Sequence, residues 1–142
     1  MKVLKIIVSI IAFCLLAYYL YQVIAKPNGK KYECDKNHTV YYKGNTTEDD
    51  AKKVCSYFKE IGYLVDSNEA SIQISTTEKS KDTMMMRFIV DKSKIDAESE
   101  AAFLTLGGAF SMKSLNSKPV VVILADKYMD DFKNLGYAKP VY

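Results

Sequence analysis

The chain has 142 residues, of which 49% are hydrophobic and 26% are charged, and its formal net charge is +3. Once the first 25 residues are set aside, the length suits a single domain, in which 18 Lys and Arg residues stand against 17 Asp and Glu residues. Arg87 is the only arginine of the chain, and nucleic-acid binding usually needs a basic surface rich in arginine, so we predict no nucleic-acid partner.

The first feature along the chain is an apolar run from Ile6 to Ala25, 20 residues without a charge. A helix of this length would extend roughly 30 Å, which is the thickness of the hydrocarbon core of a bilayer. Tyrosines, which favour the membrane–water interface, lie near its C-terminal end at Tyr18, Tyr19 and Tyr21. We therefore predict a transmembrane signal anchor over residues 1–25 that contacts the membrane through residues 6–25.

Cleavage of this leader is the alternative, because Val23-Ile24-Ala25 resembles a small-residue cleavage site, and the domain would then be secreted. The apolar run is longer than the usual core of a signal peptide, which favours a retained anchor. Cys14 follows Phe13 deep inside the run, which does not fit the acylated cysteine of a lipoprotein. The short N-terminal tail favours a single-pass protein with its domain outside the cytoplasm.

A linker is predicted over residues 26–37, since Pro27 blocks continuation of the helix and Asn28-Gly29 favours a turn. The soluble α+β domain is then predicted over residues 38–142.

Six elements in the order β-α-β-β-α-β are predicted in this domain. Runs rich in β-branched or alternating apolar residues predict strands over residues 39–43, 70–76, 84–90 and 120–124. One helix begins at the N-cap Thr47 and ends at Gly62, because apolar residues recur between them at helical spacing. A second helix begins at Asp96 and runs to about Leu115.

After the last strand, Tyr128, Phe132 and Leu135 recur at helical spacing and predict a short C-terminal helix that ends at Gly136. If both β-α-β halves have right-handed crossovers, the element order gives a four-stranded antiparallel sheet with both helices on one face. The predicted fold class is therefore α+β, with an N-terminal transmembrane helix and a ferredoxin-like domain. That fold carries many functions and assigns none here.

The soluble part also resembles a small domain of unknown function from uncharacterised bacterial membrane-anchored proteins. The residues that carry the resemblance are Val40-Tyr41-Tyr42-Lys43-Gly44, Thr47, Asp50-Ala51, Tyr57-Phe58, Gly62-Tyr63-Leu64 and Arg87-Phe88-Ile89-Val90. They are strand, cap and core residues, so the resemblance implies a fold and no catalytic residues. Cys55 is not a usual feature of that group.

Cys34, His38 and Cys55 are the residues that invite a metal or nucleophile interpretation. A structural zinc site needs four ligands, usually in closely spaced pairs, and no fourth ligand is evident. A nucleophilic pair of Cys55 and His38 lacks an orienting third group. A Cys34–Cys55 disulfide is a candidate if the domain is exported, because such compartments are oxidising.

The remaining candidates have plainer interpretations. Glu48-Asp49-Asp50 is best explained as capping of a helix N-terminus, and Asp130-Asp131 as a solvated helix face. The thioethers of Met84-Met85-Met86 could suggest copper, but successive residues of a strand point to opposite faces. We found no phosphate-binding loop, dinucleotide fingerprint or hydrolase motif, so no catalytic residue, metal or cofactor is predicted.

These observations predict a membrane-anchored, non-catalytic binding or interaction module of unknown partner, in contact with a protein or with a second copy of itself. The alternatives are a thiol- or metal-dependent enzyme that uses Cys34, His38 and Cys55, and a secreted domain released from its leader.

Overall fold

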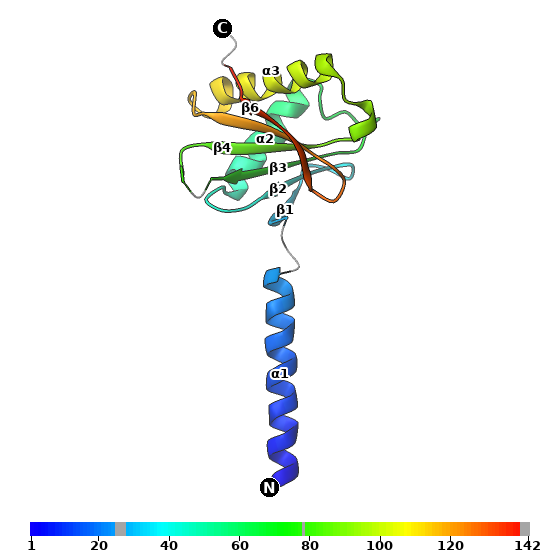
Figure 1. Cartoon of the computed structure of the whole chain (residues 1–142), viewed down its shortest axis with the longest axis vertical. Helices are drawn as coiled ribbons and strands as arrows, with labels where there is room; N and C mark the ends of the chain where they lie inside the picture. Colours follow the sequence, from blue (N-terminus) through cyan, green and yellow to red (C-terminus); the bar gives the residue numbers. More distant parts are fainter. Residues whose placement is uncertain (25–27, 78, 140–142) are drawn as a thin grey trace.

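The computed structural model describes residues 1–24, 28–77 and 79–139 (Figure 1). An N-terminal helix, α1 (Lys2–Ile24), precedes an α+β domain. The strands described in that domain are β1 (Lys30–Glu33), β2 (His38–Tyr42), β3 (Ala70–Thr76), β4 (Met84–Ile89), β5 (Val120–Ala125) and β6 (Asp131–Tyr137). Its helices are α2 (Glu48–Glu60), α3 (Ala97–Ser114) and the 3-10 turn η1 (Lys92–Lys94). Residues 25–27, at the predicted anchor–linker junction, lie outside the described residues.

The strands form one six-stranded mixed sheet in which the spatial order is the chain order, β1 to β6. Two parallel pairs, β2 with β3 and β4 with β5, are each connected through a helix. The other neighbours, β1 with β2, β3 with β4 and β5 with β6, are antiparallel.

Both long helices cover the same face of the sheet. The ring of Phe88 on β4 lies 5.7 Å from that of Phe58 on α2 and 4.8 Å from that of Phe103 on α3. Alternate strand residues such as Ile72 and Val122 join this core and are fully buried. Among the residues that the structure describes, no helix covers the opposite face of the sheet (Figure 1).

The ferredoxin-like topology is not confirmed. The predicted elements occur from β2 to β5 in the expected order, but the sheet is mixed and its strands follow the chain order. The two parallel pairs run in opposite directions while α2 and α3 share one face, so the two crossovers have opposite hands. The prediction assumed right-handed crossovers for both halves, which is the strong statistical preference of such units.

Two further elements differ from the sequence-based expectation. Residues 30–33, within the predicted linker, form β1 and pair with β2. Residues 131–137, predicted as part of a terminal helix, form β6 instead. The spacing of Phe132 and Leu135 was misleading because each is an extra residue at a bulge, where pairing with β5 skips one position. A bulge shifts the two-residue alternation of a strand and so produces a three-residue apolar spacing.

The first helix of the domain begins as predicted. The side chain of Thr47 accepts a hydrogen bond from the backbone N–H of Asp50, and the Asp50 carboxylate accepts one from the backbone N–H of Thr47. This reciprocal capping box fixes the N-terminus of α2.

Candidate functional site

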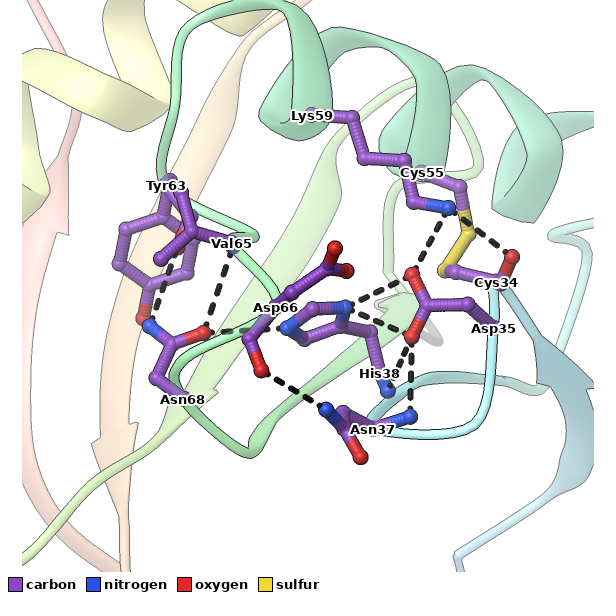
Figure 2. A network of polar contacts seen from close by, with 10 residues as sticks. All are labelled: Cys34, Asp35, Asn37, His38, Cys55, Lys59, Tyr63, Val65, Asp66 and Asn68. Carbon is purple, nitrogen blue, oxygen red and sulfur yellow. Dashed lines mark hydrogen bonds and ion pairs between the residues drawn. A yellow bond between two sulfur atoms is a disulfide. The ribbon is translucent and has the colours of Figure 1, made fainter.

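A cluster of polar side chains lies at the end of the sheet where β1 turns into β2 (Figure 2). Asp35 holds the turn, because its Oδ1 accepts hydrogen bonds from the backbone N–H groups of Asn37 and His38 at 2.9 and 3.0 Å. The backbone N–H of Cys34 donates to the carbonyl of His38 at 2.9 Å. The turn thus places His38 as the first residue of β2.

The side chain of His38 is 1% exposed, and both of its ring nitrogens face oxygen atoms. Nδ1 lies 2.8 Å from the Asp35 carboxylate, and Nε2 lies 3.0 Å from Oδ1 of Asn68. The backbone orients the Asn68 amide, because Nδ2 donates to the carbonyl of Tyr63 and Oδ1 accepts from the N–H of Val65. Both ring nitrogens are therefore placed to donate, which the imidazolium form of the ring can do.

The charges of this group stabilise one another. Burial by itself lowers the pKa of His38, but the hydrogen bonds to Asp35 and Asn68 and the charge of Asp35 outweigh it and raise the pKa above its usual 6.5. The pKa of Asp35 is held far below its usual range, first by the hydrogen bond from His38 and then by that from Lys59. Nζ of Lys59 lies 2.8 Å from the Asp35 carboxylate. We call Asp35, His38, Lys59 and Asn68 the His38 cluster.

A disulfide adds a covalent tie beside this cluster. Cys34 and Cys55 are bonded, with their Cα atoms 5.6 Å apart. The bond joins the β1–β2 turn to the middle of α2, and Lys59 lies one helical turn further along, where its Nζ donates to the carbonyl of Cys34 at 3.0 Å. Closing a loop with a sequence separation of 21 residues stabilises a fold by about 3 kcal/mol. The disulfide and the hydrogen bond from Lys59 together hold the edge strand β1 against α2.

The three residues considered for metal or thiol chemistry do lie at this end of the sheet, but they do not converge on a common ligand. The two sulfur atoms are bonded to each other, and the ring nitrogens of His38 face Asp35 and Asn68. Within the described residues, no three His, Cys, Asp or Glu side chains are grouped so that they could hold a metal ion.

The other sequence candidates lie in separate places. The acidic residues 48–50 form the first turn of α2. Asp131 begins β6 rather than lying on a helix, and it pairs with Arg87. Met84 and Met86 are buried in the core while Met85 points to the other face, as a strand requires.

A second site lies on the helix-free face of the sheet. It is a hollow of about 360 Å³, which we call the polar hollow, and the polar residues that line it are Asn28, Lys43, Gln73, Arg87, Asp130 and Asp131. Tyr128 and Met129, from the loop between β5 and β6, complete its wall. The volume falls within the range of small-molecule sites.

The floor of the polar hollow is formed by Gln73 of β3, which is buried, and Arg87 of β4, which is partly buried. Arg87 makes a bidentate ion pair with Asp131, with Nε and Nη2 2.8 and 3.2 Å from the carboxylate oxygens, and Nη1 donates to Oγ of Ser75 at 3.1 Å. Gln73 is 2% exposed, and its Nε2 donates to the carbonyl of Asn28 at 3.0 Å and contacts the sulfur of Met129 at 3.5 Å. These contacts hold β6 and the segment that follows α1 against the sheet.

Lys43, the residue after β2, brings a second positive charge to the hollow. The pKa of Lys43 is lowered from its usual value, first by burial and then by the positive charge of Arg87, while Asp131 partly opposes the shift. Lys43 and Arg87 thus both line the hollow with positively charged groups, which attract an anionic group.

Sequence reasoning did not identify the polar hollow. Gln73 and Ser75 alternate with apolar residues along β3, a pattern typical of a solvent-exposed face, yet both are 2% exposed. A usable signal was Arg87, the single arginine of the chain, placed within an otherwise apolar strand. Its partner Asp131 lies 44 positions away, so the pair could not be assigned without the topology.

Comparison with known protein families matches residues 31–136 to the AF_1994_N family N-terminal domain. The chain belongs to this family. The match spans β1 to most of β6 and therefore includes the His38 cluster and most of the polar hollow, whereas α1 lies outside it. The expected relationship to a domain family of unknown function is confirmed for these residues. No curated protein and no solved structure matches the chain.

Proposed function

We propose that the protein is a single-pass, membrane-anchored binding module without catalytic activity, with its domain outside the cytoplasm. The observation that carries the binding role is the polar hollow on the face of the sheet opposite α2 and α3, where the partly buried Lys43 and Arg87 and the exposed Asp130 and Asp131 line an accessible space. A hollow whose floor is made by residues of rigid strands is a surface on which a partner can be held.

The anchor part of the proposal is supported by α1. The window Val3–Leu20 has a mean hydropathy of 2.4, and none of it is buried against the rest of the protein. The 23 residues of α1 would extend about 35 Å, which exceeds the hydrocarbon thickness of a bilayer. A signal sequence has the same properties, and release of the domain by cleavage is the alternative.

The extracytoplasmic placement is supported by the disulfide. Cys34 and Cys55 are bonded, and structural disulfides persist in oxidising compartments and are rare in the cytosol. A thiol- or metal-dependent enzyme is disfavoured by the same contacts, since it needs free thiolates and an imidazole nitrogen with an available lone pair.

The proposal is tested with the full chain carrying an epitope tag after Tyr142 in host cells. We expect the tag to remain with membranes after an alkaline wash and to be digested by protease added to intact cells stripped of their wall. We also expect a maleimide reagent to label the extracted chain at one cysteine before reduction, Cys14, and at three afterwards, because the chain has three cysteines.

Three results would each contradict a different part of the proposal. Protection of the tag until the membrane is broken would place the domain in the cytoplasm. A mature mass lacking the leader would establish secretion. Labelling of three cysteines without reduction would show that Cys34 and Cys55 are not bonded in the cell.

A further inference from the structure

The polar hollow lies beside Asn28, the first described residue after α1. Asn28 contributes to its lining and is fixed by the 3.0 Å hydrogen bond from Gln73 to its carbonyl. The next residue, Gly29, has φ +86, and a Cβ added to it would lie 2.5 Å from the carbonyl oxygen of Tyr42 and 2.8 Å from Cβ of Lys43. The start of the domain is thus packed closely against the residues that flank the hollow.

Chain length limits the distance between the hollow and the end of α1. Ile24 is the last residue of α1, and four steps along the chain lead to Asn28. Even a fully extended chain spans only about 14 Å in four residues. Since α1 is slightly longer than the hydrocarbon core, its end and the hollow fall within reach of the lipid headgroups.

The charges in the hollow suit a ligand that carries both signs. Lys43 and Arg87 supply two positive charges, and Asp130 and Asp131 supply two negative charges, so the lining is neutral overall, and Arg87 and Asp131 are paired with each other. A phosphodiester would accept hydrogen bonds from the ammonium and guanidinium groups. A primary ammonium would donate to the carboxylates, which a trimethylammonium group cannot do.

The rim of the hollow fits the same environment. Tyr128, on the loop that forms its wall, is 70% exposed. Its neighbour Lys127 is also exposed, with Nζ 5.0 Å from the centre of the Tyr128 ring. Tyrosine and lysine together are typical of surfaces that lie at the membrane–water interface.

We propose that the polar hollow binds the headgroup of phosphatidylethanolamine, with the phosphodiester at Lys43 and Arg87 and the ammonium at Asp130. The inference rests on the proposed membrane anchoring, because it is the anchor that brings the hollow to the lipid surface. It gives the binding module a ligand of defined chemistry, a phosphate ester of a primary amine.

The test uses the full chain in lipid nanodiscs of three compositions: phosphatidylcholine alone, and phosphatidylcholine mixed equally with phosphatidylethanolamine or with phosphatidylglycerol. Native mass spectrometry of the released protein counts the lipids that remain bound, and amide hydrogen exchange follows residues 126–131. We expect preferential retention of phosphatidylethanolamine and slower exchange of this loop in its presence.

Lys43→Gln is the informative variant and Lys31→Gln its matched control, since each removes one positive charge from the part of the domain next to the anchor. Lys31 lies on β1, is 51% exposed and pairs with Glu33. We expect Lys43→Gln to reduce phosphatidylethanolamine retention about tenfold, because it removes one charge-assisted hydrogen bond. We expect Lys31→Gln to leave the retention unchanged.

Equal retention of the three lipids, or an equal effect of the two variants, would overturn the proposal. Preference for phosphatidylglycerol would show that the hollow selects a net negative charge instead. Binding of soluble phosphoethanolamine to the detergent-solubilised chain as tightly as the lipid would assign the site to a soluble phosphate ester. Failure of anchoring is recognised separately, because the chain would then be absent from the purified nanodiscs.

Discussion

His38 shows how one buried residue can organise a turn without being reactive. Its two ring nitrogens donate to Asp35 and Asn68, and Asn68 in turn is bonded to the backbone at Tyr63 and Val65. One side chain therefore links the β1–β2 turn to the loop between α2 and β3. Because the Asp35 carboxylate favours the protonated ring and raises the pKa of His38, the link depends on charge as well as on hydrogen bonds.

Replacing His38 by Gln removes this charge and leaves Asn68 and Asp35 with weaker partners. We expect the free energy of unfolding to fall by about 1–3 kcal/mol, the cost of disrupting buried hydrogen bonds. Urea unfolding of the full chain in detergent, followed by tyrosine circular dichroism, measures this change. Lys31→Gln, which removes an exposed cation, should change stability by less than about 0.5 kcal/mol, and an equal loss in both variants would contradict the role of His38.

The pH dependence of stability should identify the same residue. The pKa of His38 is raised on folding, so its contribution is complete below its usual 6.5 and is lost as pH rises through the folded-state pKa. The pKa of Asp35 is lowered, so its contribution is complete above its usual 3.8 and is lost as pH falls. His38 is the only histidine of the chain. The loss of stability above pH 6.5 should therefore vanish in His38→Gln.

At the scale of the elements, α3 depends on a pair of glycines that let it approach the sheet. A Cβ added to Gly107 would lie 2.5 Å from Cγ2 of Val122 on β5 and 3.2 Å from Cβ of Ala138. One added to Gly108 would collide with the backbone carbonyl of Lys139. The glycines thus allow the close packing of α3 on β5 and on the segment after β6.

Gly107→Ala separates packing from helix propensity. Helix propensity alone predicts that the free energy of unfolding rises by about 1 kcal/mol. The close contact of the added Cβ with Val122 on β5 instead predicts that it falls by about 1–3 kcal/mol. We expect the second result in urea unfolding. Ala102→Gly, at an exposed position of the same helix, should cost about 1 kcal/mol through propensity alone. A stabilised Gly107→Ala variant would contradict the close approach.

The elements with strong local signals could be predicted, and those defined by their partners could not. The capping box of Thr47 and Asp50 and the alternation along β3 are properties of neighbouring residues, and both elements occur where we expected them. β1 has only four residues, and its position depends on pairing with β2 and on the tie at Cys34. β6 was mistaken for a helix because its bulges disturb the alternation.

The same distinction applies to the candidate sites. Cys34, His38 and Cys55 could be named from their residue types, but the role of His38 depends on Asn68, 30 positions later. The residues that line the polar hollow lie between Asn28 and Asp131 in the sequence, and no local sequence pattern indicates that they come together.

At the scale of the whole molecule, the arrangement of the sheet divides its two faces by role. Both helices pack on one face and form the core with it. On the other face, Met129 of the loop before β6 and Asn28 at the start of the domain meet at Gln73, and Asp131 at the start of β6 pairs with Arg87. The polar hollow therefore depends on where the chain enters the domain, and in the proposed anchored protein the tether sets its distance from the membrane.

Lengthening the tether should weaken lipid binding without changing the hollow. An insertion of about ten Gly and Ser residues before Asn28 would roughly triple the chain between Ile24 and Gly29. The effective concentration of a tethered site falls approximately as the −3/2 power of tether length, which gives about a fivefold loss. We expect phosphatidylethanolamine retention in nanodiscs to fall by this factor, while binding of soluble phosphoethanolamine remains unchanged.

The matched control carries the same insertion after Tyr142, where it does not separate the hollow from the anchor, and it should retain the lipid as the parent chain does. Equal retention by both insertions would mean that the hollow does not depend on its distance from the membrane. A loss of soluble headgroup binding in the tether variant would instead show that the insertion disturbs Asn28 and the contact with Gln73. Only the fivefold loss confined to the lipid supports a site positioned by the length of its own anchor.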